Sequence, residues 1–271
     1  MKSFLADGNW YLHRAYSIAG THDPKDQVAK LFVSMICKDA LATRCRNLLV
    51  AFDGDRIFRY KVYKKYKSSR SNHGEGEVSD REIYTVSLPY LKTILDLLEF
   101  PWIQKREYEA DDILMSTSLL DGHFVIGSKD KDIYQALKSN VQIYVGMKDP
   151  YFVTANDCKA KFGVSPKKMV MYQSLVGDAI DDIPQILKPN VAKKLCNKYR
   201  SLKDVDDAEL NLILLENKAR ILRNRKLVKL VTTVPGIPGP LKSGIHKKWD
   251  KAPNSLVQYS QFANPKTRSL F

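Results

Sequence analysis

The stretch from residue 108 to residue 132 limits the possible folds more than any other part of this chain. It opens with Glu-Ala-Asp-Asp at 109–112, followed by apolar residues at helical spacing, which predicts a helix that begins in acids. The apolar run 124–127 then predicts a short buried strand that leads to Asp130 and Asp132. Acids at the start of such a helix and at the end of such a strand meet at one edge of a parallel sheet.

Carboxylates gathered at one edge repel one another unless a cation lies among them. This stretch supplies a set of five, namely Glu109, Asp111, Asp112, Asp130 and Asp132. The sequence therefore predicts a divalent metal site at that edge.

Two earlier strands are also predicted to end in aspartate. Residues 3–6 lead to Asp7, and the apolar run 48–52 leads to Asp53. A simpler interpretation stays open for each acid taken singly, because acidic residues are common in turns and at helix starts. It applies to Asp7, Asp53, Asp55, Glu109, Asp112, Asp130, Asp178 and Asp181. That interpretation needs a separate coincidence at every motif.

Strand and helix patterns alternate through the first part of the chain. Strands are predicted at 3–6, 48–52, 100–103, 124–127, 141–145 and 151–153, and helices at 28–42, 83–98, from 109 and from 154 to Gly163. This alternation is typical of an α/β fold with four or five parallel strands. Further helices are predicted at 165–176, 191–199 and 204–230, before an irregular tail from Pro235. We therefore predict an α/β domain at 1–163 and a helical region at 164–271.

The chain is strongly basic, and the basic residues are concentrated. Lys and Arg number 44 against 30 Asp and Glu, a formal net charge of +14, which is typical of a protein with a polyanionic partner. Residues 56–70 contain seven basic residues, four aromatics and no acid. Charge runs are often solvated helix faces, but unopposed cations interleaved with tyrosines favour nucleic-acid binding. With the polar stretch that follows, we predict a basic helical arch and loop at 56–80.

The sequence argues against a membrane protein and against a disulfide-rich protein. No apolar run approaches the length of a membrane span. The four cysteines are scattered, without a CxxC pair or matching histidines. We expect free thiols in a reducing compartment, and hence a cytoplasmic protein without membrane contact.

Taken in order, the acidic motifs resemble those of the 5′-nuclease superfamily, which includes flap endonucleases, the 5′ nuclease domain of bacterial DNA polymerase I, and bacteriophage 5′→3′ exonucleases and ribonucleases H. The motifs are Asp7, Asp53, Glu109-x-Asp111-Asp112, Asp130-x-Asp132 and Gly177-Asp178-x-x-Asp181. The resemblance extends from Asp7 to about Tyr199. It implies a PIN-like, mostly parallel sheet flanked by helices, followed by a helix-three-turn-helix element that grips duplex DNA.

The resemblance also implies two divalent ions, normally Mg²⁺ or Mn²⁺. Residues that match Asp7, Asp53, Glu109 and Asp111 surround the first ion in such proteins. Those that match Asp130, Asp132 and Asp178 surround the second, and Asp112 and Asp181 match further acids. Carboxylate oxygens are ligands that hard cations of this kind prefer.

In the basic segment, the resemblance implies residues that act on the substrate. Tyr66 would stack on a nucleotide beside the cut, while Lys67 and Arg70 would stabilise the transition state. Arg59 would hold a phosphate, and we expect further DNA contacts from the nearby cations Lys61, Lys64 and Lys65.

The chain departs from the family pattern after the last acidic motif. The family has a glycine-rich hairpin there, whose backbone approaches a phosphate and holds potassium. Residues 185–190 contain no glycine, and Pro189 lacks an N–H, which argues against a K⁺ site. We expect Lys188, Lys193 and Lys194 to bind duplex DNA by charge instead, with a steep dependence on salt.

The leading hypothesis is a monomeric, metal-dependent 5′ nuclease of a bacterial or phage-infected cell. Its substrates would be 5′ flaps, nicked or branched duplexes, and RNA–DNA hybrids. One alternative is a PIN-type ribonuclease, although such chains are usually shorter and lack the 177–199 element. The other is a DNA-structure binder that does not cleave, which the complete set of acids makes less favourable.

Overall fold

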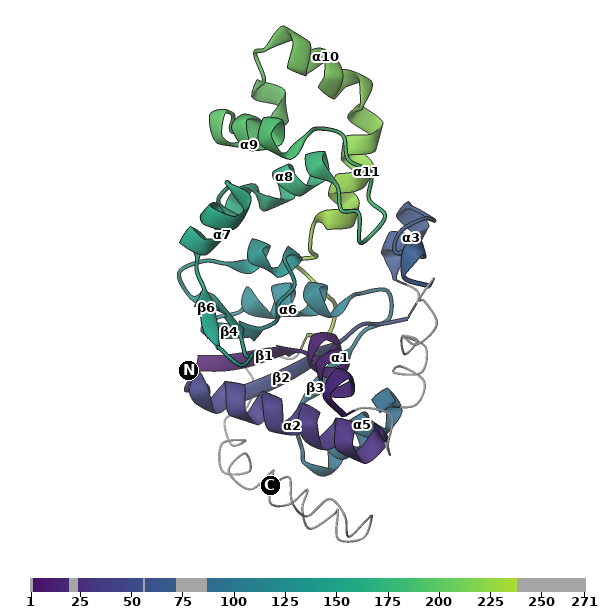
Figure 1. The fold of residues 1–271 in the computed structure, drawn as a ribbon, viewed down its shortest axis with the longest axis vertical. Coiled ribbons are helices and arrows are strands. Elements are labelled where there is room, and N and C mark those ends of the chain that lie inside the picture. The colour runs from purple at the N-terminus through teal and green to yellow at the C-terminus, as the bar shows by residue number, and fades with distance from the viewer. Residues whose placement is uncertain (1, 20–23, 56, 72–86, 238–271) are drawn as a thin grey trace.

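A computed structural model of the protein describes residues 2–19, 24–55, 57–71 and 87–237, without the side chains of residues 24, 25, 70 and 71. Its centre is a six-stranded sheet in the order β3-β2-β1-β4-β5-β6 (Figure 1). The strands are β1 (Lys2–Asp7), β2 (Asn47–Phe52), β3 (Trp102–Gln104), β4 (His123–Gly127), β5 (Val141–Val145) and β6 (Tyr151–Val153).

Five strands are parallel, and the sixth corrects the prediction. β6 runs antiparallel to β5, with Tyr144 opposite Phe152, whereas we placed residues 151–153 in a parallel sheet. Only residues 146–150 join the two strands, and a parallel return needs a crossover of a dozen residues or more. The short connection therefore decides the direction of β6.

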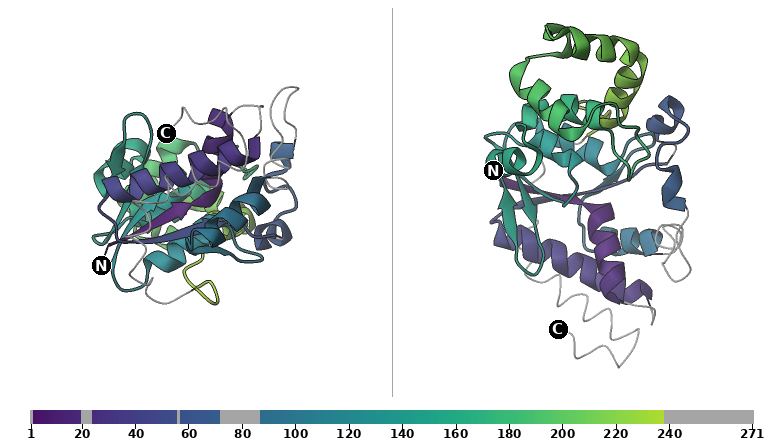
Figure 2. Two further views of the ribbon diagram at one scale, coloured as in Figure 1. Left: turned by 90° about the horizontal axis from the view of Figure 1, so that it is seen from below. Right: turned by 45° about the horizontal axis from the view of Figure 1, so that its top comes forward.

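Successive side chains of each strand point to opposite faces of the sheet, and helices cover both faces. Phe4 and Ala6 of β1 pack with α1 (Gly8–Ala19), α2 (Pro24–Ala42) and α5 (Leu88–Leu97). Leu5 packs in the other core cluster, which includes α6 (Ala110–Ser118). The result is a three-layer α/β architecture, in which the sheet is seen edge-on between helices in Figure 2.

Helix α1 was not predicted. β1 passes into it without a loop, because the Asp7 side chain accepts a hydrogen bond from the Trp10 N–H at 3.0 Å and so caps the first turn. A Cβ on Gly8 would lie 2.7 Å from the Ala51 carbonyl oxygen, so the close approach of helix and strand requires glycine there. The apolar spacing of Tyr11, Leu12 and Ala15 was the available signal.

The second half of the chain is helical after α7 (Ala155–Phe162). Thr154 caps α7 and Gly163 ends it at φ 73°, both as predicted. The helices that follow are α8 (Met169–Val176), α9 (Pro189–Lys198), α10 (Ala208–Glu216) and α11 (Lys218–Val228), at one end of the molecule (Figures 1 and 2). Side chains of these helices and of the sheet share one hydrophobic cluster, so the two parts pack together.

The basic segment is less helical than predicted. Only α3 (Phe58–Val62) is α-helical; turns follow, and then the 3₁₀ turn η1 (Ser68–Ser71). The chain leaves the helix at Tyr63, which is extended, and Lys67 has a φ of 53°. The reason is tertiary, since the Lys67 N–H donates to the Asp181 carbonyl at 3.1 Å. Residues 72–80 of the predicted arch and loop lie outside the described residues.

Two further observations concern the predictions from composition. All four cysteines are free and buried, as expected. None of the helices in the described ranges combines the length and the apolar character that crossing a bilayer requires.

Candidate active site

The carboxyl ends of the parallel strands form one edge of the sheet, and a cavity opens there. β1 lies between β2 and β4, so the strand order reverses at this point, where α/β folds commonly bind ligands. The cavity has a volume of about 410 Å³. Seven carboxylates from five separate segments line it, namely Asp7, Asp53, Glu109, Asp111, Asp130, Asp132 and Asp181. The structure thus brings together most of the acids singled out in the sequence.

Asp7 is at the centre of this edge and is 6% exposed. One carboxylate oxygen accepts the Trp10 N–H, and the other accepts the Ser128 hydroxyl at 2.8 Å. Burial raises the pKa of Asp7 to about 7, and the negative charges of Asp53 and Asp130 add to the shift. Asp7 therefore lies in surroundings that need positive charge before it can ionise fully at neutral pH.

Asp53 and Asp111 face the same space from β2 and α6. Asp53 accepts the Ala110 N–H at 2.7 Å and so fixes the first turn of α6 at the end of β2. One oxygen of Asp111 is buried and has no hydrogen-bond partner among the described residues. Burial raises the pKa of Asp111 well above its ordinary value, and the carboxylates of Asp130 and Asp7 raise it further.

A second group of acids lies beside the first. Oxygens of Asp132, Asp178 and Asp181 all lie within 4.8 Å of one another. Burial, together with the charges of Asp130, Asp181 and Asp178, raises the pKa of Asp132 well above its ordinary value. The Lys131 ammonium lies 2.6 Å from Asp178, so a protein cation partly balances this group.

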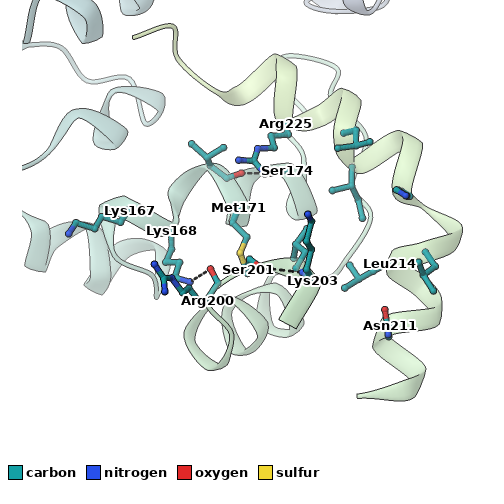
Figure 3. Close-up of a pocket in the computed structure, with 16 residues that line it drawn as sticks. Lys167, Lys168, Met171, Ser174, Arg200, Ser201, Lys203, Asn211, Leu214 and Arg225 are labelled. Atoms are coloured by element: carbon teal, nitrogen blue, oxygen red, sulfur yellow. Dashed lines mark hydrogen bonds between the residues drawn. The ribbon is translucent and has the colours of Figure 1, made fainter. Parts of the chain in front are cut away.

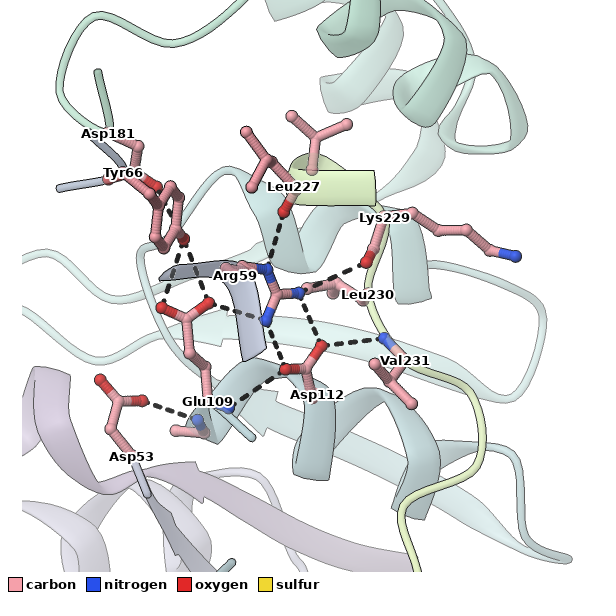
Figure 4. A network of polar contacts seen from close by, with 12 residues as sticks. Asp53, Arg59, Tyr66, Glu109, Asp112, Asp181, Leu227, Lys229, Leu230 and Val231 are labelled. Atoms are coloured by element: carbon pink, nitrogen blue, oxygen red, sulfur yellow. Dashed lines mark hydrogen bonds and ion pairs between the residues drawn. The ribbon is translucent and has the colours of Figure 1, made fainter. Parts of the chain in front are cut away.

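Glu109 differs from its neighbours because cations already surround it. The carboxylate pairs with Lys67 and lies 3.0 Å from the Arg59 guanidinium, and the Tyr66 hydroxyl donates to it at 3.2 Å (Figure 4). Burial alone would raise the pKa of Glu109, but the charges of Lys67 and Arg59 lower it below its ordinary value. Glu109 is therefore held ionised at the edge of the cavity.

Asp112 does not face the cavity, which corrects its prediction as a metal ligand. It is fully buried, and both of its oxygens accept hydrogen bonds from the Arg59 guanidinium, at 2.6 and 2.8 Å. The N–H groups of Glu109 and Val231 also donate to it, at 3.1 and 2.9 Å. These four bonds use the accepting capacity of the carboxylate within the protein (Figure 4).

The same contacts correct the prediction for Arg59. Its side chain is 1% exposed, and the guanidinium also donates to the Leu227 and Lys229 carbonyls at the end of α11. A phosphate cannot reach a guanidinium enclosed in this way. Burial lowers the pKa of Arg59, but the bonds to Asp112 and the charge of Glu109 raise it more, so Arg59 stays charged.

Tyr66 also differs from its predicted role in this structure. Tyr66 lines the cavity, but its side chain is only 3% exposed and its hydroxyl donates to Glu109 and Asp181, so little of the ring is open to a stacked base. Burial and the charges of Glu109 and Asp181 raise its pKa, which keeps the hydroxyl protonated as a donor. Lys67 lies at the cavity beside it.

The remaining predicted cations lie around the cavity or on the helical region. Lys61 pairs with Glu107, and Lys64 and Lys65 are exposed in the turns after α3. The backbone of Arg70 lies in η1, and its side chain is outside the description. Lys188 is exposed just before α9, where Lys194 is exposed and Lys193 is partly buried.

Sequence reasoning missed the residues that support the acids. Ser128 donates to Asp7, Lys131 pairs with Asp178, and the Gln173 amide donates to Asp132. The alternation Lys129-Asp130-Lys131-Asp132 was a usable signal, because a lysine between two carboxylates suits an internal ion pair. Nothing in the sequence distinguished Gln173.

The donor set fits divalent cations. It consists of carboxylate oxygens, three of which belong to residues with raised pKa values, and it includes the unpartnered buried oxygen of Asp111. Hard cations such as Mg²⁺ bind oxygen ligands, so they would neutralise the repulsion between the carboxylates and supply a partner for the Asp111 oxygen.

A solved structure shares the α/β fold of this chain. The T5 D15 protein, co-crystallised with metal ions, matches with a TM-score of 0.72 and 18% sequence identity. The match covers 95% of this chain and 99% of that chain. At this identity the likeness establishes the common fold.

The chain belongs to the family of the 5′-3′ exonuclease N-terminal resolvase-like domain, whose family model matches residues 2–163. The 5′-3′ exonuclease of Aquifex aeolicus is 31% identical over 213 residues, covering 74% of this chain and 71% of that protein. DNA polymerase I of Bacillus subtilis is 27% identical over 260 residues, which cover 86% of this chain. The matched residues make up 28% of the length of that polymerase.

Proposed function

We propose that this chain is a divalent-metal-dependent, structure-selective 5′ nuclease, acting as a 5′→3′ exonuclease and flap endonuclease. It would hydrolyse phosphodiester bonds at or near the 5′ ends of DNA or of RNA primers during replication or repair. The observation that carries the proposal is the cavity where seven carboxylates and Lys67 meet. Family membership and the net charge of +14 also support it.

In the proposed reaction a water oxygen attacks phosphorus while the bond to the 3′ oxygen breaks, leaving a 5′ phosphate and a 3′ hydroxyl. Mg²⁺ or Mn²⁺ ions bound by these carboxylates would supply Lewis acidity for the attack of water and for the departure of the 3′ oxygen. Asp7, Asp53, Glu109 and Asp111 would hold one ion, and Asp130, Asp132, Asp178 and Asp181 the other. Lys67 supplies a positive charge where negative charge develops on the phosphate.

The substrate would be a 5′ flap, a nicked or branched duplex, or an RNA–DNA hybrid, bound by a monomer. Residues 1–163 form the nuclease domain of this proposal, and residues 164–271 form its DNA-binding region, with a helix-three-turn-helix element at α8 and α9. Lys188, just before α9, and Lys193 and Lys194 of α9 contact the duplex, while Lys61, Lys64, Lys65 and Arg70 approach it from the basic segment. No potassium site is proposed.

A cleavage assay on a labelled 5′-flap duplex, with and without Mg²⁺, tests the proposal. The wild-type chain is expected to cut only with the metal, and Asp130→Ala is expected to lose about a hundredfold in rate or more. Asp121→Ala is the matched control, because Asp121 is an exposed aspartate in the turn before β4. Binding without cutting at any metal concentration would leave the non-cleaving interpretation, and cutting of single-stranded RNA alone would favour the ribonuclease.

A further inference from the structure

A second cavity of about 800 Å³ lies between α8, the turn at 200–203 and the pair α10–α11. It shares no lining residue with the acidic cavity. Seven of its lining residues are apolar, and six are cationic, namely Lys167, Lys168, Arg200, Lys203, Lys218 and Arg225. No lining residue is acidic. Lys167, Lys168 and Arg200 come from one side of this groove, and Asn211 and Leu214 from the opposite side (Figure 3).

Helix α10, which forms one wall of the groove, has more apolar surface than its packing uses. Leucine and isoleucine occupy five of its nine positions, but only Leu214 is buried. Leu212 is 58% exposed and Leu215 is 61% exposed, and Leu222 of α11 is 51% exposed. Leu215 and Leu222 line the groove, so its wall has exposed apolar side chains that no described part of the chain covers, and such exposed apolar surface commonly marks an interaction site.

We propose that this groove binds an acidic segment of a partner protein that carries bulky apolar side chains at helical spacing. The apolar walls would take leucine or phenylalanine side chains, and the cations around them would pair with aspartate and glutamate.

Charge selects this occupant over the alternatives. The segment of this chain beyond the described residues, 238–271, carries six cations and a single acid, Asp250, so it is repelled by the cations of the groove. A second copy of a chain with a net charge of +14 is disfavoured for the same reason. A nucleic acid would use the cations but leave the exposed leucines without a role, since its backbone requires charge and hydrogen bonding.

A binding assay with two synthetic peptides tests the proposal directly on the full chain. The first peptide is fluorescein-labelled and interleaves aspartate and glutamate with leucines at positions i, i+3 and i+7. The second has serines in place of those leucines. Fluorescence anisotropy is expected to show that the leucine peptide binds at least about tenfold more tightly. Equal binding of both peptides would overturn the proposal.

Two variants of the groove separate its apolar and charged parts. Leu215→Ser and Lys218→Glu are each expected to weaken binding of the leucine peptide by about tenfold or more. The matched controls are Leu97→Ser on α5, where Leu97 is 55% exposed, and Lys38→Glu on α2, and these are expected to change binding by less than about twofold. An equal loss in the controls would contradict the proposal.

Two other outcomes would also overturn it. Lys218→Glu could weaken duplex DNA binding while the leucine peptide binds no better than the serine peptide, which would make the groove a nucleic-acid site. Light scattering could show a wild-type dimer that Leu215→Ser converts to a monomer, which would make the occupant a second copy.

Because both substituted residues are exposed, each variant is expected to keep a thermal midpoint within a few degrees of the wild type. If one variant fails to fold, the other still decides the result.

Discussion

Arg59 joins three parts of the chain through one guanidinium. It connects α3 to Asp112 of α6 and to the carbonyls at the end of α11, and it also lies beside Glu109. The basic segment is therefore anchored to the acidic cavity by a buried ion pair. Breaking one partner of such a pair leaves an uncompensated buried charge.

Replacing Arg59 by alanine is expected to lower the free energy of unfolding by about 3–5 kcal/mol, because Asp112 would stay charged and lose two bonds. Urea denaturation measures the change. Arg46→Ala, at an exposed arginine, is the matched control and is expected to stay within about 0.5 kcal/mol of the wild type. The double variant Arg59→Met with Asp112→Leu should recover part of the loss; a further loss instead would speak against the ion pair as the cause.

Asp111 provides a second test at the scale of a residue. In EDTA at neutral pH, Asp111→Asn is expected to raise the free energy of unfolding by about 1 kcal/mol or more, because burial and the neighbouring carboxylates oppose ionisation of Asp111 in the folded state, whereas a neutral amide carries no such penalty. Addition of Mg²⁺ is expected to raise the free energy of unfolding less for the Asp111→Asn variant than for the wild type, since the asparagine amide is a weaker metal ligand than the carboxylate.

Calorimetry with and without Mg²⁺ measures both effects of the Asp111 substitution. Asp121→Asn serves as the control, because this aspartate is exposed and lies outside the cavity. If Asp111→Asn gained as much thermal stability from Mg²⁺ as the wild type does, Asp111 would not be a ligand.

At the scale of elements, the turn after α8 positions the second group of acids. Gly177 ends α8 with φ 66° and ψ −164°, a conformation that is essentially restricted to glycine. A Cβ there would lie 2.3 Å from the Ile183 carbonyl oxygen. The backbone bonds between Asp178 and Ile183 close the turn, so that Asp178 and Asp181 point to the same space.

Gly177→Ala is expected to cost about 1–3 kcal/mol of stability and to weaken metal binding, because the turn must shift and move both aspartates. Thermal denaturation and a Mn²⁺ titration measure the two effects. Gly236→Ala is the matched control, since Gly236 also has a positive φ, of 67°, but its nearest side-chain neighbour is the flexible Lys105 ammonium at 3.0 Å. Equal effects of the two substitutions on Mn²⁺ affinity would contradict this account.

The first turn of α6 shows that the simple and the functional interpretations of an acid can both be correct. Glu109 and Asp112 start the helix as acids commonly do, and the Glu109 N–H donates to Asp112. Glu109 nevertheless faces the cavity, whereas Asp112 is turned toward Arg59. Asp111, which also faces the cavity, and Asp112 are consecutive positions of α6, so their side chains leave the helix in different directions and one motif supplies both a site residue and a buried anchor.

At the scale of the whole molecule, the chain carries a net charge of +14, and Lys188 and Lys194 are exposed in its helical region. Duplex affinity is expected to fall steeply with salt, as for proteins that bind through phosphate contacts. Lys188→Ala and Lys194→Ala at α9 are each expected to reduce the slope of log affinity against log salt by about 1. Fluorescence anisotropy on a labelled duplex over a range of salt concentrations measures this slope.

Lys38→Ala is the control for the salt experiment, because α2 lies at the opposite end of the molecule from α9 (Figures 1 and 2). It is expected to leave the slope unchanged. An equal change of slope for Lys38 and for the α9 lysines would show that the total charge, and no local contact, governs the affinity.

The fold was largely predictable where local pattern and tertiary structure agree. The runs 48–52 and 141–145 are strands, and Thr154 and Gly163 cap α7, because apolar periodicity and capping chemistry act over a few residues. The exceptions are α1, the direction of β6 and the basic segment. Each depends on contacts or connection lengths that lie outside a local window.

The sequence by itself determined the order of the strands and of most helices, the set of acids at the strand ends and the excess of positive charge. These follow from periodicity and from the preference of oxygen ligands for hard cations. Only the tertiary structure decided which acids share a cavity and which form a buried ion pair instead, as Asp112 does with Arg59. The reason is that burial and the nearest charge govern the state of a carboxylate, and both are properties of three-dimensional packing.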